Sequence, residues 1–250
     1  MKISFCTTCM NRLHHISNTL GANIKEAAAI GGEVVLLNYG STDGLDEWIK
    51  SNWTRILPYF EAGNFKYFHT KAPQYFFAAH AKNVAHKLAS GDILCNLDAD
   101  NYLISGYPQF LYDSFSKKKD VIVLSEDTPD THGHGFCGKI AVNKDFFYNV
   151  NGYDESQNEG WGWDDTNFQY RTKTYNELST IECPAHFNRA ILHSIEERVV
   201  NYKNQNIYET QNMSIANLNK LFEEKRFVAN IGQKWGSATV IDINGNETSI

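Results

Sequence analysis

The sequence lacks any apolar run that approaches the ~20 residues needed to cross a bilayer, and its first residues, MKISFC, lack the apolar stretch of a secretory signal. Long runs of lysine or arginine are also absent, and 23 Lys and Arg against 29 Asp and Glu leave a formal net charge of −6. Because proteins bind nucleic acids largely by neutralising phosphates, this charge argues against a nucleic-acid partner. We expect a cytoplasmic protein with no membrane span and no nucleic-acid partner.

Cysteine is scarce, with five residues in 250, whereas 42% of the residues are hydrophobic and can bury a sizeable core. This composition excludes a disordered tail and a disulfide-stapled miniprotein. Cys6, Cys95 and Cys137 fall in segments predicted to be buried strands, so reduced core thiols are the simplest interpretation. Cys6 and Cys9 have the spacing of a redox or zinc motif, but no second such pair completes a four-ligand site.

The first half of the chain alternates short β-branched or apolar runs with amphipathic stretches. Leu13, Ile16 and Leu20, for example, recur at helical spacing. Strands are predicted between such helices at residues 3–6, 33–37, 65–68 and 92–97. This order indicates a mostly parallel sheet with right-handed crossovers and helices on both faces. Sheets of this kind bind ligands at the carboxyl ends of their strands.

The regular alternation loosens after a strand predicted at residues 121–124. A strand at residues 139–142, a helix from about Asp164 and a strand near residues 178–183 follow. No Pro-rich or Ser-rich linker separates the two halves, so we expect the second half to extend the same sheet. The polar, mostly helical C-terminal region ends in a strand-like run at residues 238–243.

Two carboxylates one residue apart, Asp98 and Asp100, directly follow the strand predicted at residues 92–97. Paired oxygen ligands of this kind suit Mg²⁺ or Mn²⁺, and a metal there can neutralise a departing diphosphate. An Asp-x-Asp pair also occurs by chance on solvated loops. The segment NYGSTDG follows the strand at residues 33–37, and its plain interpretation is a tight strand-to-helix turn capped by Ser or Asp.

The segment GWGWDDTN, residues 160–167, combines two indoles with two acids. Asp164 and Asp165 stand at a predicted helix start, where acidic side chains are favourable in any helix. Trp161 and Trp163 are flanked by glycine and are costly to expose unless they stack on a ligand, and sugar rings offer apolar C–H faces to indoles. The two indoles together with the two acids are therefore a more specific indication of a sugar site than either pair alone.

Six motifs, taken in chain order, resemble those of family 2 glycosyltransferases of the GT-A fold. The second half is also similar to β-1,4-galactosyltransferases and polypeptide N-acetylgalactosaminyltransferases. The motifs are SFCTTCMNR, NYGSTDG, AKNVA, LDAD, FCGKIAVNKDFFYNVNGYDE and GWGWDDTNFQYR. The resemblance implies a single α/β domain of GT-A type, with a Rossmann-like, mostly parallel sheet flanked by helices. Residues 1–195 would form the catalytic domain, and residues 196–250 a helical C-terminal extension packed on the same domain.

The implied reaction moves a hexose or N-acetylhexosamine from a UDP-sugar to a saccharide hydroxyl, with a divalent metal and with inversion. For the donor, the resemblance assigns Thr8, Asn11 and Arg12 to the border of the nucleoside. Asn38 stands where the family usually has the Asp that contacts the base, and its amide can still donate to and accept from uracil. Lys82, where the family often has Arg, would face the donor diphosphate as a point charge.

The implied metal site contains Asp100 as a ligand, and Asp98 on the metal-bound water or on the ribose. His193 matches the late histidine that completes the metal site in the two related families. An imidazole among the ligands favours Mn²⁺ over Mg²⁺. A lone histidine near a strand end is often a structural residue, and His186 is a competing candidate.

Asp165 matches the catalytic base of the family, which takes the proton of the acceptor hydroxyl as that oxygen attacks the anomeric carbon. The resemblance assigns Asp164 to holding the acceptor sugar. From their stacking chemistry, we expect Trp161 and Trp163 to bind the sugar donor and to shape its pocket. The inverting reaction has no covalent intermediate, so no nucleophilic Ser or Cys is expected.

Three alternatives stay open at this point. His132 and His134, in a glycine loop, are either metal ligands or part of a loop that lines the donor-sugar or acceptor pocket. A non-catalytic carbohydrate- or nucleotide-binding module of the same fold would have no reason to keep Asp98, Asp100 and Asp165. A sugar nucleotidyltransferase shares the sheet and the metal, but its Gly- and Lys/Arg-rich phosphate loop near the N-terminus is missing here.

Family analogy also indicates a role in building a bacterial surface polysaccharide. The implied partners are a nucleotide-sugar donor and a saccharide or lipid-linked saccharide acceptor. A lipid-linked acceptor would be met at the inner face of the membrane by a membrane-peripheral enzyme.

Overall fold

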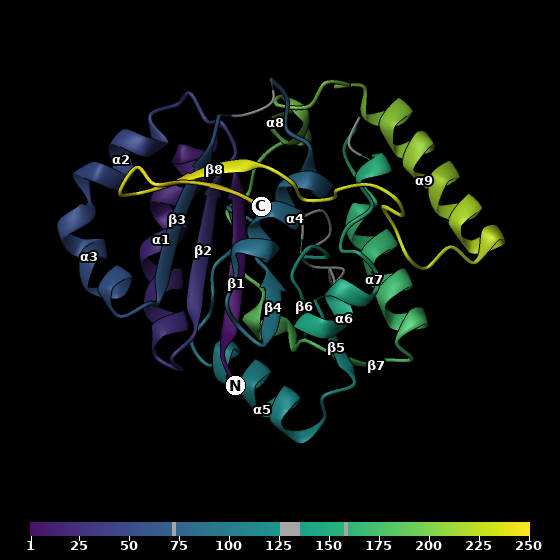
Figure 1. Cartoon of the computed structure of the whole chain (residues 1–250), viewed down its shortest axis with the longest axis horizontal. Helices are drawn as coiled ribbons and strands as arrows, with labels where there is room; N and C mark the ends of the chain where they lie inside the picture. Colours follow the sequence, from purple (N-terminus) through teal and green to yellow (C-terminus); the bar gives the residue numbers. More distant parts are fainter. Residues whose placement is uncertain (72–73, 126–135, 158–159) are drawn as a thin grey trace.

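The computed structural model describes residues 1–71, 74–125, 136–157 and 160–250. Its strands form one nine-stranded sheet in the order β7-β5-β6-β4-β1-β2-β3-β8-β9 (Figure 1). The strands are β1 (Ile3–Cys9), β2 (Glu33–Asn38), β3 (Phe65–Thr70), β4 (Ile93–Asn96), β5 (Val121–Leu124), β6 (Ile140–Asn143), β7 (Ser179–Glu182), β8 (Thr239–Asp242) and β9 (Glu247–Ser249).

The four strands β3, β2, β1 and β4 are parallel to one another, as the alternating pattern predicts. The run EVVLLN of β2 is buried along its whole length, which is typical of a strand covered by helices on both faces. The later strands make the sheet mixed. β6 is antiparallel to β4 and β5, β7 is parallel to β5, and β8 is antiparallel to β3 and β9.

Helices cover both faces of the sheet, and strand residues alternate between two apolar cores. Val34 and Leu36 of β2 pack in the core under α1, α2, α3 and α5, whereas Val35 and Leu37 pack in the core under α4, α6 and α7. These helices are α1 (Leu13–Ala28), α2 (Leu45–Ser51), α3 (Trp53–Glu61), α4 (Ala78–Leu88), α5 (Tyr107–Lys117), α6 (Lys144–Asn149) and α7 (Asp164–Tyr175). The sequence pattern did not predict α5.

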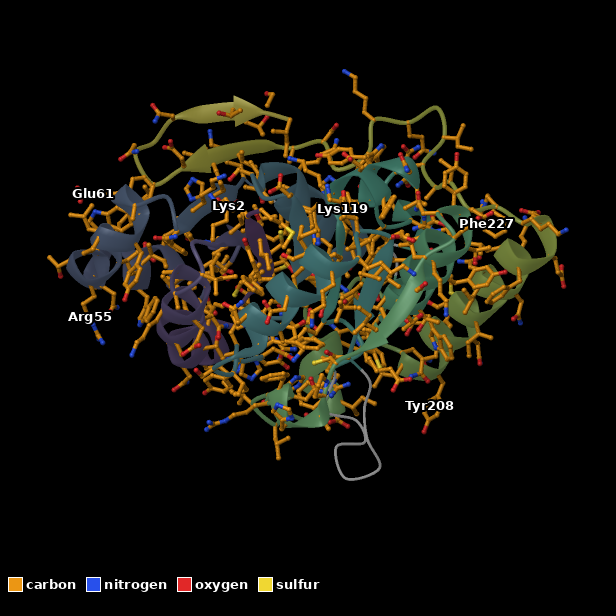
Figure 2. All side chains as sticks on the ribbon, turned by 90° about the horizontal axis from the view of Figure 1, so that it is seen from below. Lys2, Arg55, Glu61, Lys119, Tyr208 and Phe227 are labelled. Atoms are coloured by element: carbon orange, nitrogen blue, oxygen red, sulfur yellow. The ribbon has the colours of Figure 1, made fainter. Side chains whose placement is uncertain are left out.

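The C-terminal region begins with the short helix α8 (Ile195–Val199) and the long helix α9 (Ile207–Glu224). α9 lies beside α7, on the opposite side of the molecule from α2 and α3 (Figure 1). Leu218 and Leu221 of α9 are buried, whereas Tyr208 is 83% exposed and projects outward (Figure 2). The chain then runs back across the molecule to add β8 beside β3, so the strand-like run at residues 238–243 is confirmed as part of the same sheet.

The cysteines correct one expectation. Cys6 and Cys95 are buried as predicted, but Cys137 is exposed, because it lies in the loop before β6 and not in a strand. Cys6 and Cys9 are three residues apart in β1, so their side chains enter opposite cores. That geometry excludes a shared metal or a disulfide between these two thiols.

No helix among the described residues is both long enough and apolar enough to span a bilayer.

Candidate active site

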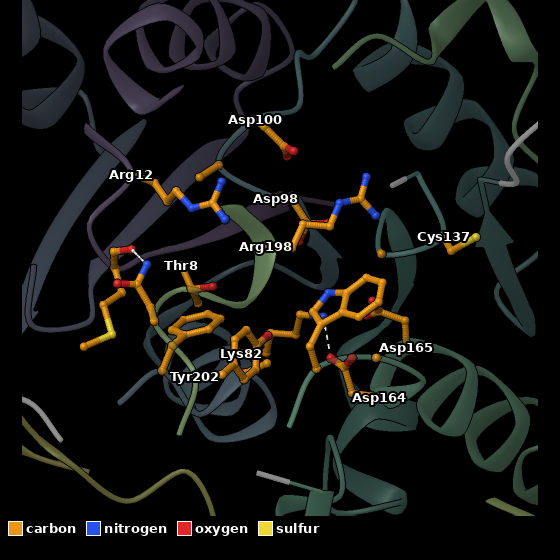
Figure 3. A pocket seen from close by; sticks show the side chains of 18 of the residues that line it. Thr8, Arg12, Lys82, Asp98, Asp100, Cys137, Asp164, Asp165, Arg198 and Tyr202 are labelled. Carbon is orange, nitrogen blue, oxygen red and sulfur yellow. Dashed lines mark hydrogen bonds and ion pairs between the residues drawn. The ribbon is translucent and has the colours of Figure 1, made fainter. Parts of the chain in front are cut away.

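A cavity of about 680 Å³ opens at the carboxyl ends of β1 and β4, where the parallel part of the sheet predicts a ligand site (Figure 3). Separate parts of the chain line it: the end of β1 with the start of α1, α4 with the segment before it, the loop after β4, the loop before β6, and the region from Trp161 to Gln211. The predicted site residues that line it are Thr8, Arg12, Lys82, Asp98, Asp100, Trp161, Trp163, Asp164, Asp165 and His193. The fold therefore brings together residues predicted from motifs that lie far apart in the chain.

The acid pair at the start of α7 is bound to one buried ammonium group. Lys82 Nζ of α4 lies 2.7 Å from Asp164 Oδ2 and 2.7 Å from Asp165 Oδ1. The Lys82 side chain is 7% exposed, and its ammonium also lies 5.1 Å from the centre of the Tyr153 ring. Burial by itself lowers the pKa of a lysine, but the two carboxylates hold the pKa of Lys82 well above its usual value. Lys82 is therefore a cation with two anionic partners.

Asp165 has a strongly raised pKa. Burial raises it most, the Asp164 charge adds to the shift, and Lys82 opposes it, so the pKa of Asp165 rises from 3.8 to about 7. A carboxylate with a pKa near the working pH is well suited to accept a proton from a hydroxyl group. The geometry and the charge distribution both favour Asp165 as a general base.

Gly138 provides the space in which acids from two elements approach each other. A Cβ atom at this position would lie 2.6 Å from Asp98 Oδ2 and 3.1 Å from Asp165 Oδ2. Asn96, the last residue of β4, donates from Nδ2 to the Gly138 carbonyl over 2.8 Å and to Asp98 Oδ1 over 3.1 Å. Burial raises the pKa of Asp98, and the neighbouring Asp100 charge raises it further. A side chain at residue 138 would therefore displace Asp98 and press against Asp165.

Asp100 faces in another direction and contacts His193. Its Oδ2 atom lies 2.7 Å from His193 Nε2, and both side chains are almost buried. Burial by itself raises the pKa of Asp100, but hydrogen bonds from His193 and Asn101 lower it below its usual value. His186 lies instead in a short 3-10 helix, exposed and against Phe187. Of the two candidate histidines, His193 is the one placed beside the Asp-x-Asp motif.

The chemistry of this donor pair fits a divalent cation, because a carboxylate oxygen and an imidazole nitrogen are both common ligands of Mn²⁺. Asp98 turns toward Gly138, and among the described residues Asp98, Asp100 and His193 do not form a tight cluster of three ligands. Asp100 and His193 are therefore two candidate ligands for a metal, and their predicted role as metal ligands stays a prediction. The predicted part of Asp98 in that site stays a prediction.

Asn38 and Asn11 do not line the cavity. Asn38 is 2% exposed; its Nδ2 donates to Asp46 and to the Tyr67 hydroxyl, and its Oδ1 accepts from the Ser41 amide. Asn11 has a φ of 54° in the left-handed region, and its Oδ1 accepts from the amide of Thr42. Both side chains hold the loops after β1 and β2 in place. Their predicted contacts with the donor nucleoside stay predictions.

Trp163 combines exposure with an uncommon backbone conformation. It is 40% exposed, and its φ of 65° lies in the left-handed region, which a bulky residue rarely adopts. Such conformations cluster at functional sites. Trp161 lies in the same lining and is covered by the Arg198 guanidinium, 5.6 Å from its ring centre. Trp163 is thus placed where a ligand can stack, whereas Arg198 already occupies one face of Trp161.

Sequence reasoning missed several lining residues, among them His15, Gly138, Arg198 and Tyr202. Arg198 and Tyr202 come from a region without a chemical motif. Of these four residues, only Gly138, in the FCGK segment, belongs to a motif that could have indicated the site. His14, His15 and Glu197 offer ligand atoms within 4.8 Å of one another at the cavity rim, and the Arg12 guanidinium beside His15 makes that place unfavourable for a cation. His132 and His134 lie outside the described residues.

Residues 121–198 match a family model described as the N-terminal domain of galactosyltransferase. The segment includes β5, β6, α7 and β7, and with them Asp164, Asp165 and His193. A comparison with curated protein sequences finds no match for this chain.

Solved glycosyltransferase structures share the fold. S. aureus TarS in complex with UDP superposes with a TM-score of 0.62 at 14% identity, over 86% of this chain and 65% of the TarS chain. The mannosyltransferase PcManGT from Pyrobaculum calidifontis, in complex with GDP-Man and Mn²⁺, gives 0.59 at 19% identity, over 76% and 57%. The catalytic domain of Drosophila β1,4-galactosyltransferase 7, in complex with xylobiose, gives 0.53 at 14% identity, over 86% and 79%.

Identities this low establish the fold alone, and the chain spans 65% of the length of the TarS chain. The comparisons together show a chain of GT-A fold in which residues 121–198 are similar to the N-terminal domain of galactosyltransferase.

Proposed function

We propose that this protein transfers a hexose or N-acetylhexosamine from a UDP-sugar to a saccharide hydroxyl, with inversion at the anomeric carbon. One observation carries the proposal: Asp165, Asp98 and the Asp100–His193 pair, from three separate parts of the chain, line one cavity at the carboxyl end of the parallel strands. The family resemblance assigns to these residues the roles of base, donor contact and metal ligands.

The reaction needs one base and one leaving group. Asp165 takes the proton of the acceptor hydroxyl, the acceptor oxygen forms a bond to the anomeric carbon, and the bond from that carbon to the UDP oxygen breaks. Attack opposite the leaving group inverts the configuration. A cation held by Asp100 and His193 would supply positive charge against the diphosphate. Asp164, beside Asp165 at the start of α7, is placed to bind an acceptor hydroxyl.

The choice of UDP over GDP rests on the family resemblance and on TarS, whose structure holds UDP, whereas PcManGT holds GDP-Man. Thr8 and Arg12 line the cavity and would border the donor nucleoside, and Trp161 and Trp163 would stack on a sugar ring. We extend the proposal to surface polysaccharide synthesis on a saccharide or lipid-linked acceptor at the inner face of the membrane.

The test is a screen of UDP-sugars and GDP-sugars with Mn²⁺, with and without mono- and disaccharide acceptors, read out as nucleoside diphosphate release. We expect one UDP-sugar to give release that increases with acceptor. Pyrophosphate release from UTP and a sugar phosphate would instead identify a nucleotidyltransferase. Tight binding of UDP without any turnover would identify a binding module of the same fold.

A further inference from the structure

The ammonium group of Lys82 has its hydrogen-bonding capacity largely occupied. A lysine ammonium has three donors, and here two of them reach Asp164 and Asp165 over 2.7 Å each. The remaining side faces the Tyr153 ring, 5.1 Å away. Lys82 thus bridges the two adjacent acids at the first turn of α7 (Figure 3).

The surroundings of Lys82 hold it in this place. α4 packs against β1 and β2, and Asn83, the next residue, is fully buried. Asn83 donates from Nδ2 to the Tyr153 carbonyl over 2.9 Å and accepts at Oδ1 from the Tyr153 amide over 2.7 Å. These two bonds fix the backbone that carries the Tyr153 ring over Lys82. The ammonium is therefore positioned by the fold before any ligand enters.

Moving Lys82 to a donor diphosphate would leave Asp164 and Asp165 side by side without a counter-charge. Removing one partner from a buried charged pair is strongly destabilising, because the other charge stays buried and unpaired. The cavity offers other cations for a diphosphate. Arg12 and Arg198 also line it, on the side that Asp98 and Asp100 occupy (Figure 3).

We propose that Lys82 is a positioning residue for the acid pair: it holds the Asp165 carboxylate toward the acceptor hydroxyl and holds Asp164 beside it, and it is not a ligand of the donor diphosphate. This proposal rests on the proposed function and revises the role that the family resemblance gives to Lys82. The two roles differ in measurable ways, because a diphosphate ligand acts on donor binding whereas a positioning residue acts on turnover through Asp165.

The experiment compares Lys82→Met, Lys82→Arg and Asp165→Asn with the wild type. UDP affinity is measured by calorimetry with Mn²⁺, and kcat and KM are measured with the donor that the wild type uses. For Lys82→Met we expect kcat to fall roughly 10²-fold, within the range that general-base catalysis contributes, while UDP affinity changes less than about threefold. Lys82→Arg should recover part of kcat, because a guanidinium can also bridge two carboxylates.

The double variant Lys82→Met/Asp165→Asn separates this role from a merely structural one. If Lys82 acts through Asp165, the double variant loses no more kcat than Asp165→Asn alone. Additive losses would overturn the proposal, and so would a UDP affinity reduced tenfold or more in Lys82→Met. Circular dichroism melting checks that each variant is folded, and Lys82→Gln, which also removes the charge, replaces Lys82→Met in the cycle if the latter does not fold.

The UDP titration needs no turnover. A wild type that binds UDP but transfers no sugar would overturn the proposed function, and the calorimetry of Lys82→Met would still decide whether Lys82 contacts the diphosphate.

Discussion

Asp100 and His193 are 93 residues apart in the chain, yet Asp100 Oδ2 and His193 Nε2 lie 2.7 Å apart. Main-chain contacts bring them together. The amide of Ile191 donates to the Asp100 carbonyl, the amide of Tyr102 donates to the Arg189 carbonyl, and Asn101 pairs with Ala190 as an isolated bridge. The segment that carries His193 is thus bound along the Asp-x-Asp loop before any metal is considered.

This pairing predicts that His193→Ala weakens Mn²⁺ binding in the presence of UDP. We expect a loss of at least about 10-fold, since removing even a partner of a metal ligand usually costs 10–100-fold in metal affinity. Calorimetric titration of Mn²⁺ into the UDP-loaded protein measures it. His186→Ala is the matched control, because His186 is exposed and does not line the cavity. An unchanged titration of His193→Ala would remove this residue from the metal site.

Asp165→Asn should bind UDP as the wild type does and lose transfer by roughly 10²–10⁴-fold, the usual contribution of a general base. The substitution keeps the size of the side chain and removes its ability to accept a proton. Steady-state release of UDP and calorimetry on the same preparation measure the two quantities. Turnover close to that of the wild type would show that another group accepts the proton.

Gly138→Ala should reduce kcat without a comparable loss of stability. The added methyl group would lie 2.6 Å from Asp98 Oδ2, so that carboxylate must move, and misplacement by about 1 Å can cost roughly 10²-fold in rate. Gly21→Ala is the control, because a Cβ there meets nothing within 4 Å and Gly21 lies inside α1. That control should keep its activity and gain about 0.5–1 kcal/mol of stability. Normal kcat in Gly138→Ala would mean that the acids tolerate displacement.

Acid should destabilise the fold through Glu33 at the start of β2. The residue is fully buried; burial by itself raises its pKa, but hydrogen bonds from Lys2, Ser4 and Ser90 lower it from 4.5 to about 2. A lowered pKa in the folded state stabilises the protein above pH 4.5, and this contribution is lost as the pH falls toward 2. The shift corresponds to about 3 kcal/mol at most.

Urea unfolding of the wild type and of Glu33→Gln at several pH values between 7 and 2.5 measures the contribution of this group. We expect the stability difference between the two proteins to shrink as the pH falls below 4.5, because protonation makes the wild type resemble the variant. A difference that stays constant over this range would show that Glu33 titrates normally. Asp92→Asn is the control, since that side chain is 66% exposed.

Local patterns predicted much of the fold for a physical reason. The buried run of β2 and the helical spacing of α1 reflect burial of one element against its neighbours, and burial leaves a periodicity in the residues themselves. The same logic placed Asp98 and Asp100 at a strand end, and hence at the edge where the cavity opens. The prediction was wrong for Cys137, because an apolar residue near a short strand gives the same sequence pattern whether it belongs to the strand or to the adjoining loop.

The sequence by itself determined the β-α alternation of the first half and the positions of the acidic motifs. Its resemblance to known families also singled out Asp165 and His193 among the acids and histidines of the chain. Only the tertiary structure decided the antiparallel placement of β6 and β8, the turning of Asp98 toward Gly138, and the pairing of Lys82 with Asp164 and Asp165. The reason is distance along the chain. A hydrogen bond between residues 82 and 165 leaves no trace in the spacing of either segment, since it depends on how α4 and α7 pack on the same face of the sheet.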